Sequence, residues 1–389
     1  MTDKKKILLL TRPICPPWDE GSKNFAYTLA KHAGGFEIHL LTCVEKGDLA
    51  PNWGLSPQSN VICHDIYTSP KWNWPQKIRA YIFLLKEFFL KGGKDYDILH
   101  SFFTPTKLNV FALKLCLRNK NIKTIQTLAT LRDDLYASEK IKEIIHADHI
   151  VTYSDYAKEK LEKMGFENIK RIYPGIDIEK YSPAPKNAEL MKKYNTTEND
   201  FVINYTGEYV RLGDMDDVVE TFVDLVSANK NLKLHLAVRV KNQKDAEKKR
   251  EAAQRLENAG CLDRVAFMDD GSYEMQDIYN LADISIFPAR TMAGKFDIPL
   301  AVIEAMACEK PVIASNLERL QYFLNDENSI LIEPGDREAL KEKILYLCNN
   351  PEARRELGQK GMQFVRENFD IMKVVKEYED VYASLNKEQ

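Results

Sequence analysis

The protein has 389 residues, which favours two domains over one, because single domains usually contain about 100–200 residues. Hydrophobic residues make up 44% of the chain and charged residues 29%, a balance that excludes a disordered protein. The formal net charge is −3, which argues against a nucleic-acid-binding protein, because such proteins usually carry a strongly basic domain.

The first half of the chain alternates short apolar runs with segments of helical spacing. A strand at 7–11, a turn-rich stretch, a helix at 24–32 and a strand at 38–42 form the opening βαβ unit of a parallel sheet. Further strands are predicted at 97–100, 123–127, 149–152 and 169–172, and further helices at 77–89, 107–117 and 156–163.

Turn residues then cluster at Pro174, Gly175 and Pro183, which suits a hinge between domains. The same alternation resumes after them. Strands are predicted at 201–206, 233–238, 265–268, 284–287, 311–314 and 330–332, and helices at 214–227, 246–257, 275–281, 300–308, 337–348, 351–367 and 371–385. The sequence therefore predicts an α/β fold of two facing, Rossmann-like, doubly wound domains, with ligands at the carboxyl ends of the strands.

The seven cysteines are scattered and form no CxxC pair, which favours a reducing compartment over disulfides or a zinc site. The apolar run at 7–10 is too short for the hydrophobic part of a signal peptide, and no stretch of about 18 apolar residues is present. We therefore expect a cytoplasmic protein.

The most informative segment surrounds Glu304 and has the pattern loop, helix, turn, strand. Pro299 suits the first turn of a helix, which leaves the N–H groups of Leu300 and Ala301 facing the preceding loop. Such a helix N-terminus can bind a diphosphate, and Lys295 lies just upstream. Glu304, one turn further on, could accept hydrogen bonds from the two hydroxyls of a ribose. The alternative is a buried amphipathic helix whose Glu304 pairs with a neighbouring cation.

Several segments in this order resemble those of GT-B retaining glycosyltransferases of family 4, over nearly the whole chain. The similar segments are VTYSD at 151–155, RIYPGID at 171–177, YSP at 181–183, IYNLADISIFP at 278–288, and EAMA followed by KPVIA at 304–314. Each segment is a weak or moderate signal alone, and together they indicate the fold and the superfamily.

The resemblance implies an enzyme that transfers a sugar, with retention, from a nucleotide-diphosphate sugar to a glycan, lipid-linked or small-molecule acceptor. Residues 1–175 would bind the acceptor, 176–370 would bind a UDP- or GDP-sugar, and a helix in 371–389 would cross back to the first domain. The resemblance implies no metal and no other cofactor. The leaving diphosphate would be stabilised by cations and helix N-termini.

The sequence departs from the family pattern at the sugar and phosphate positions. Phe296 occupies the place of the family's first glutamate, eight residues before Glu304, and Asp297 is a candidate substitute. The family's two cationic positions after Gly207 hold other residues, which makes Arg211 a candidate cation. Lys295, Arg239 and Lys241 are the next candidates.

Three features of the first half complete the prediction. His100 lies at the end of a predicted strand, at a family-like position, and is a candidate for facing the cleft. Gly21, with Asp19 and Glu20 before it, lies where a glycine loop could approach the donor; the alternative is a capping turn. Residues 71–94 combine basic, aromatic and apolar residues, which suits either peripheral contact with an anionic membrane or a core-facing helix with solvated lysines.

The missing first glutamate keeps a second function open, a nucleotide-sugar-binding partner subunit with weak or no transfer activity. A nucleotide-sugar epimerase with the same architecture is a third candidate, which the segments fit less well.

Overall fold

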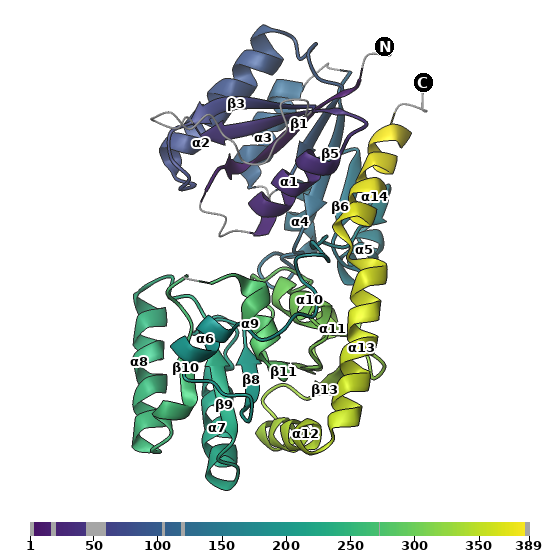
Figure 1. The fold of residues 1–389 in the computed structure, drawn as a ribbon. Coiled ribbons are helices and arrows are strands. Elements are labelled where there is room, and N and C mark those ends of the chain that lie inside the picture. The colour runs from purple at the N-terminus through teal and green to yellow at the C-terminus, as the bar shows by residue number, and fades with distance from the viewer. Residues whose placement is uncertain are drawn as a thin grey trace. The chain divides into compact units, whose positions relative to one another are not determined.

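The computed structural model describes residues 4–16, 21–43, 60–102, 106–117, 121–271 and 273–385. The chain divides into two compact units, Met1–Gly175 with Ile371–Gln389, and Ile176–Asp370. Each unit is built around one sheet in which every described strand pair is parallel (Figure 1). Two parallel α/β units confirm the predicted fold class.

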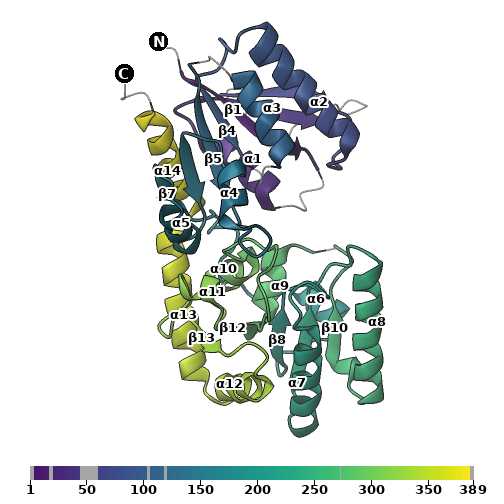
Figure 2. The ribbon, with the colours of Figure 1, turned by 180° about the vertical axis from the view of Figure 1, so that it is seen from behind.

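The first unit contains a seven-stranded sheet in the order β3-β2-β1-β4-β5-β6-β7. The strand order reverses between β1 and β4, so helix α1, which follows β1, covers one face of the sheet. Helices α2 and α3, which follow β3 and β4, cover the other face and lie nearer the viewer in Figure 2. The strands are β1 Lys6–Ile14, β2 Glu37–Cys43, β3 Val61–Tyr67, β4 Ile98–Ser101, β5 Lys123–Leu128, β6 His149–Thr152 and β7 Ile169–Arg171. The helices are α1 Gly21–His32, α2 Trp74–Leu84, the π-helix η1 Leu85–Leu90, α3 Lys107–Leu117, α4 Ser138–Ile144, α5 Asp155–Lys163 and α14 Ile371–Ser384.

The C-terminal helix α14 packs against α1 and belongs to the first unit. Its Tyr382 Oη lies 2.7 Å from Nδ1 of His100, and Nε2 of His100 lies 2.8 Å from Thr127 Oγ1. His100 has no exposed surface, and burial lowers its pKa to about 3, so the ring is neutral. The structure thus differs from the prediction of an accessible strand-end histidine, because one nitrogen of His100 contacts Tyr382 of α14 and the other contacts Thr127 of β5.

The second unit contains a six-stranded sheet in the order β10-β9-β8-β11-β12-β13, which reverses between β8 and β11. Its strands are β8 Phe201–Tyr205, β9 Leu232–Leu236, β10 Val265–Phe267, β11 Ile284–Phe287, β12 Val312–Ser315 and β13 Ile330–Ile332. Its helices are α6 Ala188–Lys193, α7 Met215–Ala228, α8 Gln243–Asn258, the 3₁₀ helix η2 Leu262–Arg264, α9 Met275–Leu281, α10 Leu300–Ala307, α11 Glu318–Gln321, α12 Arg337–Asn349 and α13 Pro351–Asn368.

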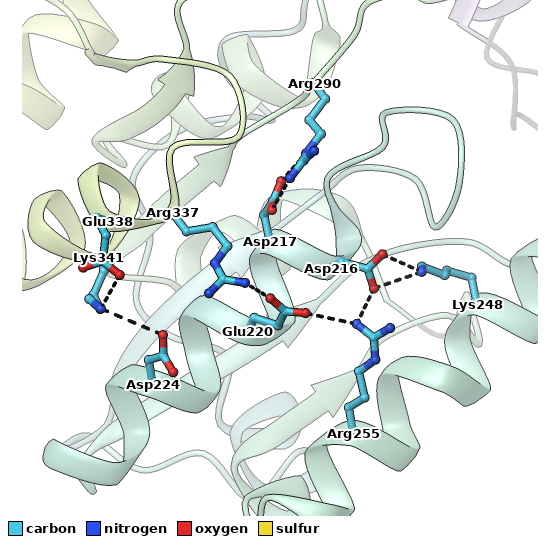
Figure 3. Close-up of polar contacts among 10 residues, drawn as sticks. All are labelled: Asp216, Asp217, Glu220, Asp224, Lys248, Arg255, Arg290, Arg337, Glu338 and Lys341. Atoms are coloured by element: carbon cyan, nitrogen blue, oxygen red, sulfur yellow. Dashed lines mark hydrogen bonds and ion pairs between the residues drawn. The ribbon is translucent and has the colours of Figure 1, made fainter.

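Acidic side chains of α7 are paired with cations from neighbouring elements, as Figure 3 shows. The pair that bears on the site joins Asp217 and Arg290 through two hydrogen bonds of 2.6 and 2.7 Å. Asp217 is buried, and Arg290 lies just after β11. This bidentate contact ties the loop after β11 to the first turn of α7.

The sequence does not predict strand β3, the three short α-helices α4, α6 and α11, or the 3₁₀ helix η2. Strand β3 lies at the edge of its sheet, where only Tyr67 is fully buried, so it lacks the continuous apolar run of a central strand. The three helices have seven, six and four residues, which is too short to show a clear helical period.

Candidate functional site

Most of the second unit's predicted site residues lie where its strand order reverses. Strands β8 and β11 are adjacent there, and their carboxyl ends lead into two loops, 206–214 and 288–299. The loops are joined by a hydrogen bond from the N–H of Arg290 to the carbonyl of Leu212, 2.9 Å long. Ligands of open α/β sheets bind at such a switch point, so this edge of the sheet is the candidate site.

A buried glutamate collects three cations at this point. Glu208 Oε1 lies 2.8 Å from Lys295 Nζ and 3.1 Å from Lys241 Nζ. Its Oε2 lies 2.9 Å from Arg211 Nε. Burial alone would raise the pKa of Glu208, but Lys295 and Lys241 outweigh it and lower that pKa, so the carboxylate is ionised. Three cations around one anion leave the cluster with a net positive charge.

The cluster contains the first candidate cation, Arg211, and two of the three next candidates, Lys295 and Lys241. Arg211 is exposed and also donates from Nη1 to the carbonyl of Gly294 at 3.2 Å. Burial lowers the pKa of Lys295, and the bond to Glu208 opposes that shift. The sequence reasoning missed Glu208, which stands where the family pattern calls for a cation. Glu208, which has no positive charge of its own, contacts three cationic side chains.

Gly207 fixes the path of the chain into this cluster. A Cβ atom at Gly207 would lie 2.2 Å from the ring and the hydroxyl of Tyr205, and Tyr205 is completely buried, so any larger residue at this position would displace it. The Tyr205 hydroxyl donates to Asp214 Oδ1 at 2.7 Å and accepts from the N–H of Glu208 at 3.3 Å. The absence of a side chain at Gly207 thus allows Tyr205 to hold the backbone of Glu208.

Helix α10 presents its N-terminus to the same loop. Pro299 is the N-cap, one position before the predicted first turn, and no side chain caps the helix. Backbone N–H groups at the first two helical positions, Leu300 and Ala301, have no partner within a helix. The positive end of the helix dipole adds to the attraction for an anion.

Glu304 lies one turn into α10 and contacts tyrosines. Tyr279 donates its hydroxyl to Glu304 Oε2 at 3.0 Å, and no salt bridge between described residues includes Glu304. The ring of Tyr181 lies 6.3 Å from that of Tyr279. Burial raises the pKa of Glu304 to about 7, although hydrogen bonds from Tyr279 and Tyr181 lower it. The cation pairing considered from the sequence is thus replaced by tyrosine hydroxyls from two of the family-like segments.

Asp297 does not lie with these groups on the accessible side. Its side chain is completely buried, and its Oδ1 lies 3.3 Å from Nη1 of Arg319, itself 7% exposed. The structure therefore directs the candidate substitute for the missing glutamate into the unit, toward α11.

The remaining candidate, Gly21, is the first residue of α1 in the other unit and is partly exposed. Asp19 and Glu20 lie outside the described residues. Among the residues that the structure describes, no group of three or more His, Cys, Asp or Glu side chains could hold a metal ion.

Comparison with known proteins identifies the family. Residues 186–364 match the family model described as Glycosyl transferases group 1, and residues 20–180 match the model described as Glycosyltransferase Family 4. The chain is a family 4-like glycosyltransferase. This confirms the resemblance found in the sequence and the prediction of an enzyme that transfers a glycosyl group.

Two sequence relatives and one solved structure illustrate what this glycosyltransferase is similar to. It is 28% identical to the capsular polysaccharide biosynthesis glycosyltransferase CapM of Staphylococcus aureus, over 65% of this chain and 66% of that one. It is 24% identical to an uncharacterised glycosyltransferase of Methanocaldococcus jannaschii, over 91% of this chain and 96% of that one. The Anabaena protein HepE, solved with UDP and glucose, superposes with a TM-score of 0.76 at 14% identity, over 98% of this chain and 100% of that one. The glycosyltransferase therefore has the GT-B fold.

Proposed function

We propose that this glycosyltransferase moves a sugar from a UDP- or GDP-sugar to a glycan, lipid-linked or small-molecule acceptor, with retention of anomeric configuration. The observation that carries the proposal is the positive cluster of Arg211, Lys241 and Lys295 around Glu208. Lys295 belongs to the loop that leads into the N-terminus of α10. A helix N-terminus and several cations at the switch point of a parallel sheet suit a diphosphate better than any neutral ligand.

In the proposed binding mode the donor's diphosphate lies against the N–H groups of Leu300 and Ala301. Glu304, one turn further along α10, accepts hydrogen bonds from the two ribose hydroxyls. Tyr279 and Tyr181, whose hydrogen bonds lower the pKa of Glu304, orient this carboxylate for the ribose. The relative HepE, whose solved structure contains UDP and glucose, supports a uridine nucleotide as one candidate donor.

In the proposed reaction the bond between the anomeric carbon and the diphosphate oxygen breaks, and negative charge grows on that oxygen. The acceptor hydroxyl forms its new bond on the same face of the sugar and gives its proton to the departing diphosphate. Arg211, Lys241 and Lys295 stabilise the charge as it develops, which is the largest contribution that fixed groups usually make to such a transfer.

Phe296 and the buried Asp297 favour a second candidate, a nucleotide-sugar-binding subunit with little or no transfer. The site shows no carboxylate at the first family position, and Asp297 faces Arg319 instead. Contacts to the hexose would then come from other residues, or the sugar would be bound without being transferred.

Release of nucleoside diphosphate from a panel of UDP- and GDP-sugars separates the two candidates. Donor-dependent release that rises with an acceptor, and that falls in Arg211→Ala and Lys241→Ala variants, supports transfer. Lys163→Ala, at an exposed lysine of α5 in the other unit, is the control. Tight donor binding without release across glycan, lipid-linked and small-molecule acceptors would favour the binding subunit.

A further inference from the structure

Helix α2 and its π-helical continuation η1 carry a row of exposed apolar side chains. The core side of the same helix holds Ala80, Phe83 and Phe88, all buried. The exposed apolar side chains are mostly three or four residues apart, as expected for the opposite side of the helix, so the helix is apolar on both faces. These are Trp74, Ile78, Ile82, Leu85, Phe89 and Leu90, with exposed fractions of 43–76%.

Helix α3 repeats this pattern beside α2. Leu108, Phe111 and Leu115 are exposed by 54%, 67% and 46%, at a spacing of three and four residues, whereas Val110 and Leu113 are buried. The two helices are in contact, and both lie toward the viewer in Figure 2. We call the exposed apolar side chains of these helices, taken together, the docking face.

The docking face holds most of the exposed apolar side chains of the described chain. Fifteen large apolar side chains are exposed among the described residues, and nine of them belong to α2, η1 and α3. Scattered exposed apolar residues need no explanation, but a contiguous cluster on two neighbouring helices marks an interaction site.

Basic residues outnumber acidic ones in the segments that carry the docking face. Residues 71–94 and 106–117 contain eight basic residues and one acidic residue, although the whole chain has a net charge of −3. The acidic residue, Glu87, is buried and lies 3.0 Å from Lys91. Lys77 Nζ lies 5.3 Å from the centre of the exposed Trp74 ring. An apolar strip with a tryptophan at one end and lysines along its edges is the pattern of a helix that lies in a membrane interface.

We propose that the docking face rests on an anionic lipid bilayer, with the apolar side chains inserted among the headgroups and the basic side chains on the lipid phosphates. The charge pattern selects this occupant over a second copy of the chain, because two copies would bring two basic rims together. An anionic leaflet attracts each Lys or Arg close to its surface. The inference is independent of the proposed function, because it involves neither the donor nor the site in the second unit.

Co-sedimentation of the full chain with vesicles tests the proposal in the absence of nucleotide and acceptor. One set of vesicles contains phosphatidylglycerol mixed with an equal amount of phosphatidylcholine, and the other contains phosphatidylcholine alone. We expect binding to the first set, weaker binding to the second, and release from the first as salt is added.

A variant with Ile78→Ser, Phe89→Ser and Phe111→Ser should bind anionic vesicles about tenfold more weakly or worse. Leu135→Ser is the matched control, because Leu135 is 58% exposed in the same unit outside the two helices. Thermal unfolding identifies any variant that fails to fold.

A second variant carries the test if the first is unfolded. Lys86→Glu with Lys114→Glu places one acidic residue on each helix, and should also lower binding about tenfold or more at low salt. Its control is Lys163→Glu, on α5.

Three outcomes would overturn the proposal. The wild-type chain would fail to sediment with anionic vesicles, or both docking-face variants would bind as well as their controls. Alternatively, ultracentrifugation would show a dimer without lipid that the serine variant abolishes, which would assign the docking face to a second copy.

Discussion

Replacing Tyr279 by phenylalanine should shift the pH dependence of donor binding. The Tyr279 hydroxyl donates to Glu304 Oε2 at 3.0 Å, and the pKa of Glu304 is about 7 because burial raises it more than its hydrogen bonds lower it. An ionised Glu304 can accept both ribose hydroxyls, whereas a protonated one loses acceptor capacity. Donor affinity in the wild-type protein should therefore rise as pH increases through 7.

The size of the shift follows from the lost hydrogen bond. A bond to a charged group contributes about 1.5–3 kcal/mol, and one pKa unit corresponds to about 1.4 kcal/mol, so Tyr279→Phe should raise the pKa of Glu304 by about one to two units. At about pH 7 the ionised fraction of Glu304 then falls from about one half to about a tenth or less. Donor affinity should fall about fivefold or more at that pH, and the loss should shrink as pH rises.

Calorimetry with a sugar nucleotide between about pH 6 and pH 8 measures this directly, because a diphosphate esterified at both ends does not titrate there. His235, the one histidine of 176–370, does not interfere, since burial lowers its pKa to about 3. Burial also raises the pKa of Asp214 to about 7, so Asp214 titrates in the same pH range. The control is Glu304→Gln, in which any remaining pH dependence of donor binding comes from Asp214. A wild-type affinity that is constant across this range would refute the reasoning.

Three further predictions concern the same unit. Arg211→Ala should lower kcat about tenfold to a hundredfold with a smaller effect on KM, whereas Lys163→Ala should change neither; unchanged steady-state kinetics would move the leaving-group cation elsewhere. Gly207→Ala should lower the free energy of unfolding by more than about 2 kcal/mol, because the new Cβ would lie 2.2 Å from Tyr205. Urea denaturation measures this change, and a variant that unfolds at the same urea concentration as the wild-type protein would contradict the prediction. Between about pH 4 and pH 7, Asp214 keeps a proton in the folded protein that it has lost in the unfolded chain, so the free energy of unfolding falls as pH rises. Asp214→Asn should flatten that part of the pH–stability curve. A slope equal to that of the wild-type protein would contradict this role of Asp214.

The fold could be predicted because its signals are local. Central parallel strands such as β1 and β8 are buried on both faces and appear as apolar runs, and the helices between them are long enough to show their period. The edge strand β3 and the short helix α4 escaped prediction for the opposite reason. One is buried on a single side, and the other depends on its packing in the folded unit.

The site could be predicted only in part, because side-chain direction is a tertiary property. Motif spacing indicated Glu304 and the start of α10, and proximity indicated Arg211 and Lys295. Spacing could not show that Glu208 would collect these cations, since Lys241 is 33 positions away in the chain. For the same reason no spacing in the chain indicates that Asp297 turns toward Arg319.

His100 illustrates the limit at the level of one residue. Its position near the carboxyl end of β4 suggested a group open to substrate, yet its two partners come from β5 and from α14, the latter 282 positions along the chain. Such a long-range contact determines whether a polar residue is buried, and no local pattern encodes it.

The most direct test of the account is a crystal structure of the protein with a bound sugar nucleotide. We predict that the diphosphate lies within hydrogen-bond distance of the N–H groups of Leu300 and Ala301 and beside Arg211 or Lys295, with the ribose on Glu304. A nucleotide bound elsewhere, with this edge of the sheet filled by the protein's own side chains, would contradict the account.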